Sequence, residues 1–197
     1  MTSLTRTELN VEPAHVLTAN RLFEPVDPVG TSRGKINMIS AMAVDGKSFK
    51  PVVKHETKKL GESEYDSLGS LFEKFYWEMT LGPITSGQIG GILDRCTKYG
   101  ATYGIYEGDE LVSFASGSGV LENVAHLSPA YTLPEFRRKG YATSACSALV
   151  RELLADNEKM ILFVSESNVP ALKVYRKIGF VRTGHTFLTF WGRKVPT

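Results

Sequence analysis

The chain has 197 residues, of which 42% are hydrophobic and 22% are charged, and its net charge is +2. This length and composition are typical of a globular protein with one domain, or one domain and an extension, that buries its own core. So small a net charge excludes any argument from charge for nucleic acid or an anionic membrane as a partner.

Residues 1 to 62 are predicted to form an N-terminal extension to a domain at residues 63 to 197. The polar start of the chain lacks the apolar stretch of a signal peptide, and no run approaches the roughly 18 apolar residues of a membrane span. We therefore expect a cytoplasmic protein. A strand-like stretch, Lys35 to Val44, precedes a turn at Asp45-Gly46 and a second candidate strand, Phe49 to Val53. The extension is thus expected to hold a small β-hairpin.

Two amphipathic helices are predicted next. Apolar residues recur at helical spacing from Leu68 to Met79, and Gly82-Pro83 ends the pattern. A second helix is expected from Ser86 to Lys98, with Gly100 as its stop.

Strand signals follow. Ala101 to Tyr106 and Leu111 to Ser116 predict a hairpin, because the residues between them include a glycine that can adopt a positive φ. A third strand is expected from Asn123 to Leu133, interrupted by Pro129. Since proline has no N–H to donate to a ladder, Pro129 predicts a bulge or a place where the sheet opens.

The last third of the chain alternates between helix and strand. An amphipathic helix is predicted from Gly140 to Ala155, a buried strand from Ile161 to Ser165, and a helix that begins after Asn168 and ends at Gly179. Phe180 to Trp191 predicts one or two final strands. The element order indicates a mixed α/β (α+β) fold around a partly antiparallel sheet.

The most informative residues, Arg137-Arg138-Lys139-Gly140-Tyr141-Ala142, lie where the third strand leads into a helix. A helix start presents unpaired N–H groups and a positive dipole end, which bind anions. Gly140 lets the backbone approach a diphosphate closely, and the basic triplet adds donors for phosphate oxygens. This R-x-x-G-x-A pattern is weak alone, and a solvated basic turn is the alternative. The lysine of a Walker loop and the glycine set of a dinucleotide fold are both missing.

Two blocks of sequence resemble the GNAT superfamily of N-acetyltransferases. Arg137, Gly140 and Ala142, with Pro134 before them, look like that superfamily's pyrophosphate loop. Val164 to Phe180 resembles its strand, asparagine, Ala-x-x-x-Tyr helix and Gly-Phe exit. Both blocks occur in the right order and at the right separation, and the resemblance covers roughly residues 65 to 193. The run Tyr-Thr-Leu-Pro-Glu-Phe-Arg is similar to the FR-type predicted acetyltransferase subgroup.

The resemblance implies a mostly antiparallel sheet, flanked by helices, in which two parallel strands splay apart so that the pantetheine arm of acetyl-CoA enters between them. It also implies that the backbone N–H near Thr132 polarises the thioester carbonyl. The coenzyme-binding residues that it implies are Tyr131, Thr132, Leu133, Arg137, Arg138, Lys139, Gly140, Tyr141, Ala142, Thr143, Asn168, Ala171 and Tyr175.

Two residues are the catalytic candidates that the resemblance implies. Tyr175 lies at the position of the general acid, with a plain core tyrosine as the alternative, and His126 is the candidate general base, with a structural strand histidine as the alternative. Glu122 is a second candidate base. Asn168 contacts the pantetheine, caps its helix, or does both. No metal site is expected.

The predicted reaction is transfer of an acetyl group from acetyl-CoA to an amine of a small molecule or a protein, by direct attack in a ternary complex. Neither cysteine lies where a nucleophile is needed. The acceptor is expected beside residues 81 to 87, with four aromatic residues as candidate lining or, as the alternative, as core residues: Tyr76, Trp77, Tyr103 and Tyr106. A catalytically silent acyl-CoA sensor and a purely structural α/β domain are the alternatives. A homodimer through Thr186 to Trp191 is left open.

Overall fold

The computed structural model describes residues 17–19, 31–79 and 84–193. Its helices are α1 (Tyr65–Glu78), α2 (Ser86–Tyr99), α3 (Tyr141–Leu153) and α4 (Val169–Lys177). Its strands are β1 (Leu17–Ala19), β2 (Thr31–Asp45), β3 (Lys58–Lys59), β4 (Gly100–Glu107), β5 (Glu110–Leu121), β6 (Val124–Thr132), β7 (Lys159–Ser165) and β8 (Val181–Arg193). The predicted elements from residue 63 onward are all present, with Phe180 to Trp191 as one strand.

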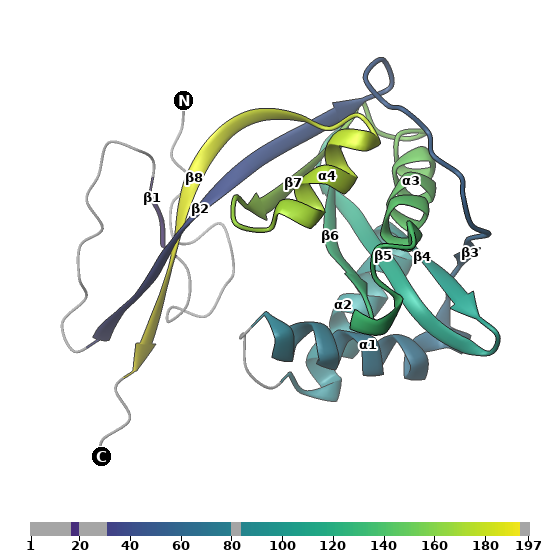
Figure 1. Ribbon diagram of the computed structural model, residues 1–197, viewed down its shortest axis with the longest axis horizontal. Helices are drawn as coiled ribbons and strands as arrows, with labels where there is room; N and C mark the ends of the chain where they lie inside the picture. The colour runs from purple at the N-terminus through teal and green to yellow at the C-terminus, as the bar shows by residue number, and fades with distance from the viewer. Residues whose placement is uncertain (1–16, 20–30, 80–83, 194–197) are drawn as a thin grey trace.

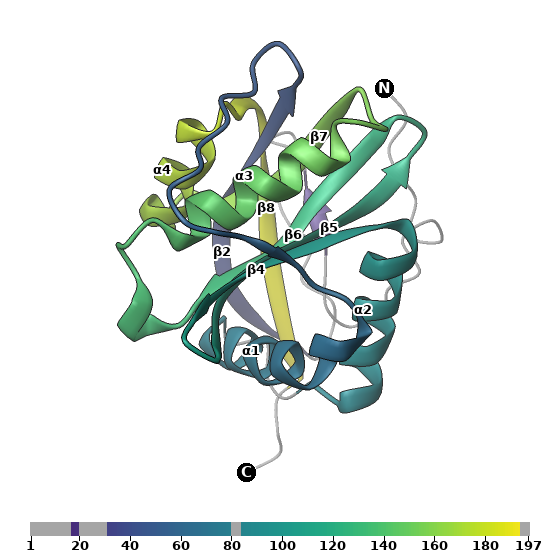
Figure 2. The same cartoon turned by 90° about the vertical axis from the view of Figure 1, so that its right-hand side faces the viewer.

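The described strands form one sheet in the order β1-β8-β2-β7-β6-β5-β4-β3. Every neighbouring pair is antiparallel except β6 and β7, which are parallel. Helices α1 and α2 cover one face and α3 the other, as Figures 1 and 2 show. On β5, Phe114 stacks on Phe72 of α1, whereas the position of a Cβ on Gly117 would contact Leu149 and Leu153 of α3. The predicted fold class is confirmed.

Local sequence explains where the helices begin and end. Thr85 and Gln88 form a reciprocal capping box at the start of α2. The side chain of Asn168 accepts a hydrogen bond from the N–H of Ala171 at the start of α4, where proline occupies the first turn. Gly179, at a φ of 104°, turns the chain out of α4.

The prediction of a small β-hairpin within residues 1–62 is wrong. The strand predicted at Lys35 to Val44 exists as part of β2, but β2 pairs with β7 and β8 in the main sheet, and residues 49–53 contain no strand. Residues 46–57 instead cross the N-terminal half of α3 on their way to β3 (Figure 2). Division of the chain at residue 62 stays a prediction, although β2 shares its sheet with the later strands.

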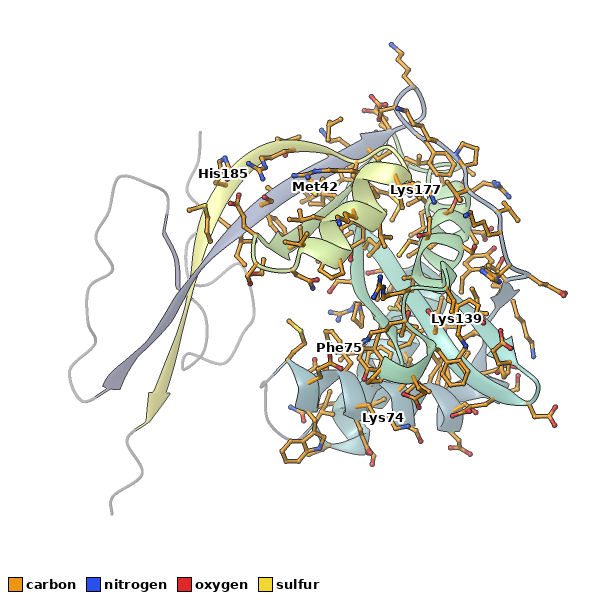
Figure 3. The ribbon with its side chains drawn as sticks, in the orientation of Figure 1. Met42, Lys74, Phe75, Lys139, Lys177 and His185 are labelled. Atoms are coloured by element: carbon orange, nitrogen blue, oxygen red, sulfur yellow. The ribbon has the colours of Figure 1, made fainter. Side chains whose placement is uncertain are left out.

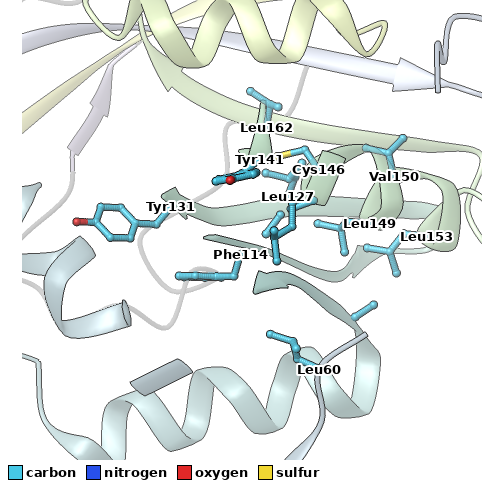
Figure 4. Packing of buried hydrophobic residues seen from close by; sticks show 14 of the residues in the cluster. Leu60, Phe114, Leu127, Tyr131, Tyr141, Cys146, Leu149, Val150, Leu153 and Leu162 are labelled. Carbon is cyan, nitrogen blue, oxygen red and sulfur yellow. The ribbon is translucent and has the colours of Figure 1, made fainter. Parts of the chain in front are cut away.

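The core lies between α3 and the centre of the sheet, with a second part under α1. Figure 4 shows apolar side chains of α3 facing those of β5, β6 and β7, among them Leu149, Leu127 and Leu162. Each of these three side chains is at most 3% exposed. This rigid centre holds the end of β6 and the start of α3, where the predicted site lies.

Candidate active site

The parallel strands β6 and β7 separate partway along their length. They pair from Val124 with Lys159 to His126 with Ile161, and no pairing between them follows in the residues that the structure describes. Beyond this point β6 still pairs with β5, and β7 still pairs with β2. The gap therefore presents backbone groups of two strand edges that have no partner across it.

A bulge in β6 lies where the gap opens. Ala115 pairs with Ala130 and Gly117 with Leu127, so Ser128 and Pro129 together stand opposite Ser116 alone. An extra residue in one strand bends that strand away from its neighbours. The bulge predicted from Pro129 is confirmed.

The N–H of Thr132 points toward the gap. The next residue, Leu133, donates its N–H to the carbonyl of Val112 on β5. Because successive backbone groups of a strand point to opposite sides, the N–H and C=O of Thr132 face the β7 side. The hydroxyl of Thr132 is held by Ser113 at 2.7 Å, which fixes this end of the strand.

The basic turn between β6 and α3 leaves its backbone N–H groups free. Arg138 has a φ of 66° and Gly140 a φ of 99°, so the chain turns sharply into the helix. No side chain caps the helix at Gly140, and in the described part of the chain the N–H groups of residues 138–143 donate no hydrogen bond. A left-handed arginine is an uncommon conformation that often accompanies a functional turn. Unpaired amides and the helix dipole make this turn suitable for an anion.

Arg137 is already bound to protein groups. Its Nε donates to the carbonyl of Thr132 at 3.0 Å, and its guanidinium forms a 2.5 Å salt bridge with Glu78 at the end of α1. Glu78 also accepts a hydrogen bond from the hydroxyl of Tyr131. The arginine lowers the pKa of Glu78, while burial and then the contact with Glu78 raise the pKa of Tyr131 to about 12. Arg137 thus ties the end of helix α1 to the turn.

The other coenzyme-binding candidates differ in what they offer. Arg138 and Lys139 are exposed, and the Nζ of Lys139 lies 4.8 Å from the centroid of the Phe136 ring (Figure 3). The side chain of Tyr141 is buried, and its hydroxyl donates a hydrogen bond to Glu107. The side chain of Tyr131 points away from the other labelled residues of the core (Figure 4), and its hydroxyl contacts Glu78 at the end of α1. Small residues flank the turn and the start of α4: Ala142, Thr143 and Ala171.

Leu133 offers the coenzyme little. Its side chain is 1% exposed, its N–H is used by Val112, and its carbonyl accepts from Phe136. Of the predicted run from Tyr131 to Leu133, Thr132 has the backbone groups that face the gap.

Tyr175 lies on α4, partly buried beside α3. Its ring makes an edge contact with Phe180, with centroids 5.8 Å apart. Within the described residues its hydroxyl forms no hydrogen bond, and its oxygen is not among the buried polar atoms that lack a partner. Burial, and secondarily the nearby Cys146 thiol, raise the pKa of Tyr175. The phenol is therefore protonated at neutral pH and has a proton to donate.

His126 lies on the face of the sheet opposite α3, and it is the last residue of β6 that pairs with β7 before the gap. Its ring contacts Phe163 of β7 with centroids 5.8 Å apart. Burial, and secondarily the charge of Arg95 on α2, lower the pKa of His126. The imidazole is thus neutral near pH 7, as a proton acceptor must be. Glu122, the second candidate base, is an exposed turn residue.

The aromatic residues expected to line one acceptor pocket lie in two places. Tyr103 binds Glu152 of α3, and Tyr106 lies near Lys58 of β3, at the sheet edge away from the gap. Tyr76 packs on Phe75 of α1, and the neighbouring Trp77 is 66% exposed. Part of the expected acceptor link, residues 81–83, lies outside the described residues.

Sequence reasoning missed the partners that hold this site in place. Glu78 could not be recognised as a site residue because it is an exposed residue at the end of an ordinary amphipathic helix, 59 positions before the arginine that it binds. Glu107 and Ser113 likewise act through contacts with residues far along the chain. No local pattern marks such pairs, and only the fold brings them together.

The gap, the bulge and the free amides of the basic turn agree with what a family comparison finds. A profile of the acetyltransferase (GNAT) family matches residues 70–180, more than half of the chain. The chain belongs to the GNAT acetyltransferase family. The family transfers acyl groups from acyl-CoA, and its coenzyme is acetyl-CoA, as predicted. The FR-type subgroup stays a prediction.

Solved structures of this family share the fold. A protein of the GNAT family from Novosphingobium aromaticivorans is 24% identical, with a TM-score of 0.70, and the match covers 91% of this chain and 74% of that one. A GCN5-related N-acetyltransferase from Kribbella flavida is 12% identical, with a TM-score of 0.58 and coverage of 85% and 61%. The aminoglycoside N-acetyltransferase AAC(6′)-Iy, in complex with CoA, is 16% identical, with a TM-score of 0.55 and coverage of 66% and 89%.

The chain spans less than two thirds of the Kribbella protein's length. Among proteins with curated descriptions, none matches the sequence. In residues 17–19, 31–79 and 84–193, the helices lack the combination of length and apolar content that a membrane crossing requires.

Proposed function

We propose that this protein is an N-acetyltransferase that moves the acetyl group of acetyl-CoA to an amine by direct attack in a ternary complex. The observation that carries the proposal is the turn at Gly140, whose amides at residues 138–143 have no partner in the described part of the chain, beside the gap between β6 and β7. These groups fit a diphosphate at the helix start and an extended arm between the strands.

When bound, acetyl-CoA supplies the acetyl group as an activated thioester. Thr132 directs its N–H to the thioester oxygen, where negative charge develops. His126 accepts the proton that the acceptor's ammonium loses, so that the amine nitrogen can bond to the carbonyl carbon. Tyr175 donates its phenolic proton to the departing thiolate and regains one from solvent. Asn168 and Ala171 border the arm at the start of α4, where Asn168 already caps the helix.

Direct attack is favoured over an acyl-enzyme because neither cysteine is reactive. Cys96 and Cys146 are both buried, and burial raises the pKa of Cys146 to about 12. A protonated, enclosed thiol is a poor nucleophile. The acceptor is an amine of a small molecule or of a protein.

Incubation with acetyl-CoA is expected to raise the melting temperature. At 100 times its Kd, a ligand of the folded state stabilises by about 2.7 kcal/mol, which corresponds to roughly 5 to 10 °C for a domain of this size. The same samples, given a panel of amines, should release free CoA thiol with at least one of them. Stabilisation without thiol release from any amine would favour the silent acyl-CoA sensor, and the absence of both would refute the proposal.

The His126→Gln variant is expected to lose about ten-fold in kcat/KM near neutral pH, since water can carry the proton less effectively in its place. Because burial lowers the pKa of His126 below the ordinary histidine value of about 6.5, the imidazole is neutral near pH 7 and becomes protonated only at a more acidic pH. The wild-type profile of kcat/KM should therefore fall on the acid side of pH 6.5. That acid limb should disappear in His126→Gln and persist in His185→Gln, which alters an exposed histidine on β8. An acid limb that survives in His126→Gln would rule out this base.

A further inference from the structure

The segment that follows β2 is fastened along the first two turns of α3. We call residues 46–57 the strap (Figure 2). The N–H of Val52 donates to the hydroxyl of Ser147 at 2.8 Å, and the N–H groups of Lys54 and His55 donate to Ser144 at 3.2 and 3.3 Å. Both serines are at most 2% exposed. These bonds place Lys54 and His55 beside the basic turn, more than 80 residues further along the chain.

His55 fixes the peptide that joins Lys139 to Gly140. Its Nε2 lies 2.9 Å from the carbonyl oxygen of Lys139. Because a carbonyl only accepts, Nε2 carries the hydrogen and donates it. The ring also makes an edge contact with Tyr141, with centroids 4.5 Å apart. In a planar trans peptide the C=O and N–H point in opposite directions, so this bond directs the N–H of Gly140 away from the strap.

Lys54 adds a positive charge beside the turn, where Glu78 neutralises the charge of Arg137. The charge of Arg137 is opposed by Glu78 in a 2.5 Å salt bridge. The side chain of Lys54 is exposed, and its Cδ lies 3.7 Å from where a Cβ on Gly140 would stand. In the described residues no acidic side chain pairs with Lys54, so its ammonium is available to a phosphate oxygen.

We infer that the strap completes the diphosphate site of the coenzyme, with His55 as a positioning residue and Lys54 as a cation that contacts phosphate. This inference rests on the proposed function and extends it to a segment outside the part of the chain that the family profile matches. Because Arg137 of the turn is bound to Glu78, the strap supplies a positive charge for the phosphates from an earlier part of the chain.

The test measures the Kd of CoA by titration calorimetry. His55→Ala is expected to weaken CoA binding about ten-fold, and His55→Gln, whose amide nitrogen can replace Nε2, should stay within about three-fold of wild type. Lys54→Ala should lose about five-fold, and Lys54→Arg should restore most of it. Lys50→Ala, an exposed lysine on the same strap, is the matched control and should bind as wild type does.

A second ligand separates the diphosphate from the other phosphate of CoA. The losses in His55→Ala and Lys54→Ala should persist with 3′-dephospho-CoA, which keeps the diphosphate. Losses that vanish with this ligand would assign the strap to the 3′-phosphate and overturn the inference. The melting temperatures without ligand show whether His55→Ala is folded, and Lys54→Ala, an exposed position, tests the strap independently.

The outcomes distinguish this inference from the proposed function. If wild type binds CoA and the four variants of His55 and Lys54 bind it equally well, the inference fails and the proposed function stands. If wild type does not bind CoA at all, both are overturned.

Discussion

The Gly140→Val variant is expected to lose at least about 100-fold in affinity for acetyl-CoA while remaining folded. Gly140 has a φ of 99°, a conformation that costs a residue with a Cβ roughly 1 to 2 kcal/mol. A side chain there would also reach His55 and Lys54, at 3.6 and 3.7 Å from its Cβ. Valine therefore both displaces the amides from the anion position and occupies the space beside them, where a diphosphate must approach.

The melting temperature of the ligand-free Gly140→Val variant should show the cost of the backbone strain separately from the loss of acetyl-CoA binding. A cost of about 1 to 2 kcal/mol lowers the melting temperature of a domain of this size by only a few degrees. Gly140→Ala, with one carbon, should show the same strain and a smaller loss of affinity. Gly46→Val is the matched control, because its φ is outside the left-handed region and its Cβ would meet no atom within 4 Å. Calorimetric titration of folded Gly140→Val that returns the wild-type Kd would remove the diphosphate from this turn.

The parts of this site that sequence alone predicts are those that depend on local physics. The helix that begins after Gly140 follows from apolar spacing and from a glycine that can adopt a positive φ, and both are properties of a short stretch. Pro129 predicts the bulge because a missing N–H disrupts any ladder, whichever strand lies alongside. For the same reason the cap at Asn168 could be recognised from residues 168 to 171.

The parts that sequence could not predict depend on which distant segments meet. The stretch at Lys35 to Val44 has the composition of a strand, but its pairing with β7 and β8 depends on residues more than 100 positions later. A short turn at Asp45-Gly46 favoured a local hairpin, because local pairing costs less chain entropy. Burial against the sheet's other strands outweighs that preference in the folded protein. The contacts of Arg137 with Glu78 and of His55 with Lys139 could not be predicted for the same reason.

The Tyr175→Phe variant is expected to lower kcat by about 100-fold or more while the Kd of acetyl-CoA changes by less than about three-fold. A positioned general acid contributes roughly 100- to 10,000-fold to a rate, and phenylalanine keeps the ring but removes the proton. The ring's contact with Phe180 is retained, so the packing of α4 should survive. Because the hydroxyl has no hydrogen-bond partner in the described residues, its loss should not reduce stability.

These three readouts separate an acid from a core tyrosine. A tyrosine that only packs α4 would leave kcat near the wild-type value in the phenylalanine variant, since the two side chains fill nearly the same volume. Tyr103→Phe is the matched control, because its hydroxyl binds Glu152 at the far edge of the sheet, and it should retain full turnover. A thiol of lower pKa leaves more readily without protonation. A thioester with a more acidic leaving group should therefore reduce the difference in kcat between Tyr175→Phe and wild type. If kcat of Tyr175→Phe is reduced by the same factor with both thioesters, Tyr175 does not protonate the leaving sulfur.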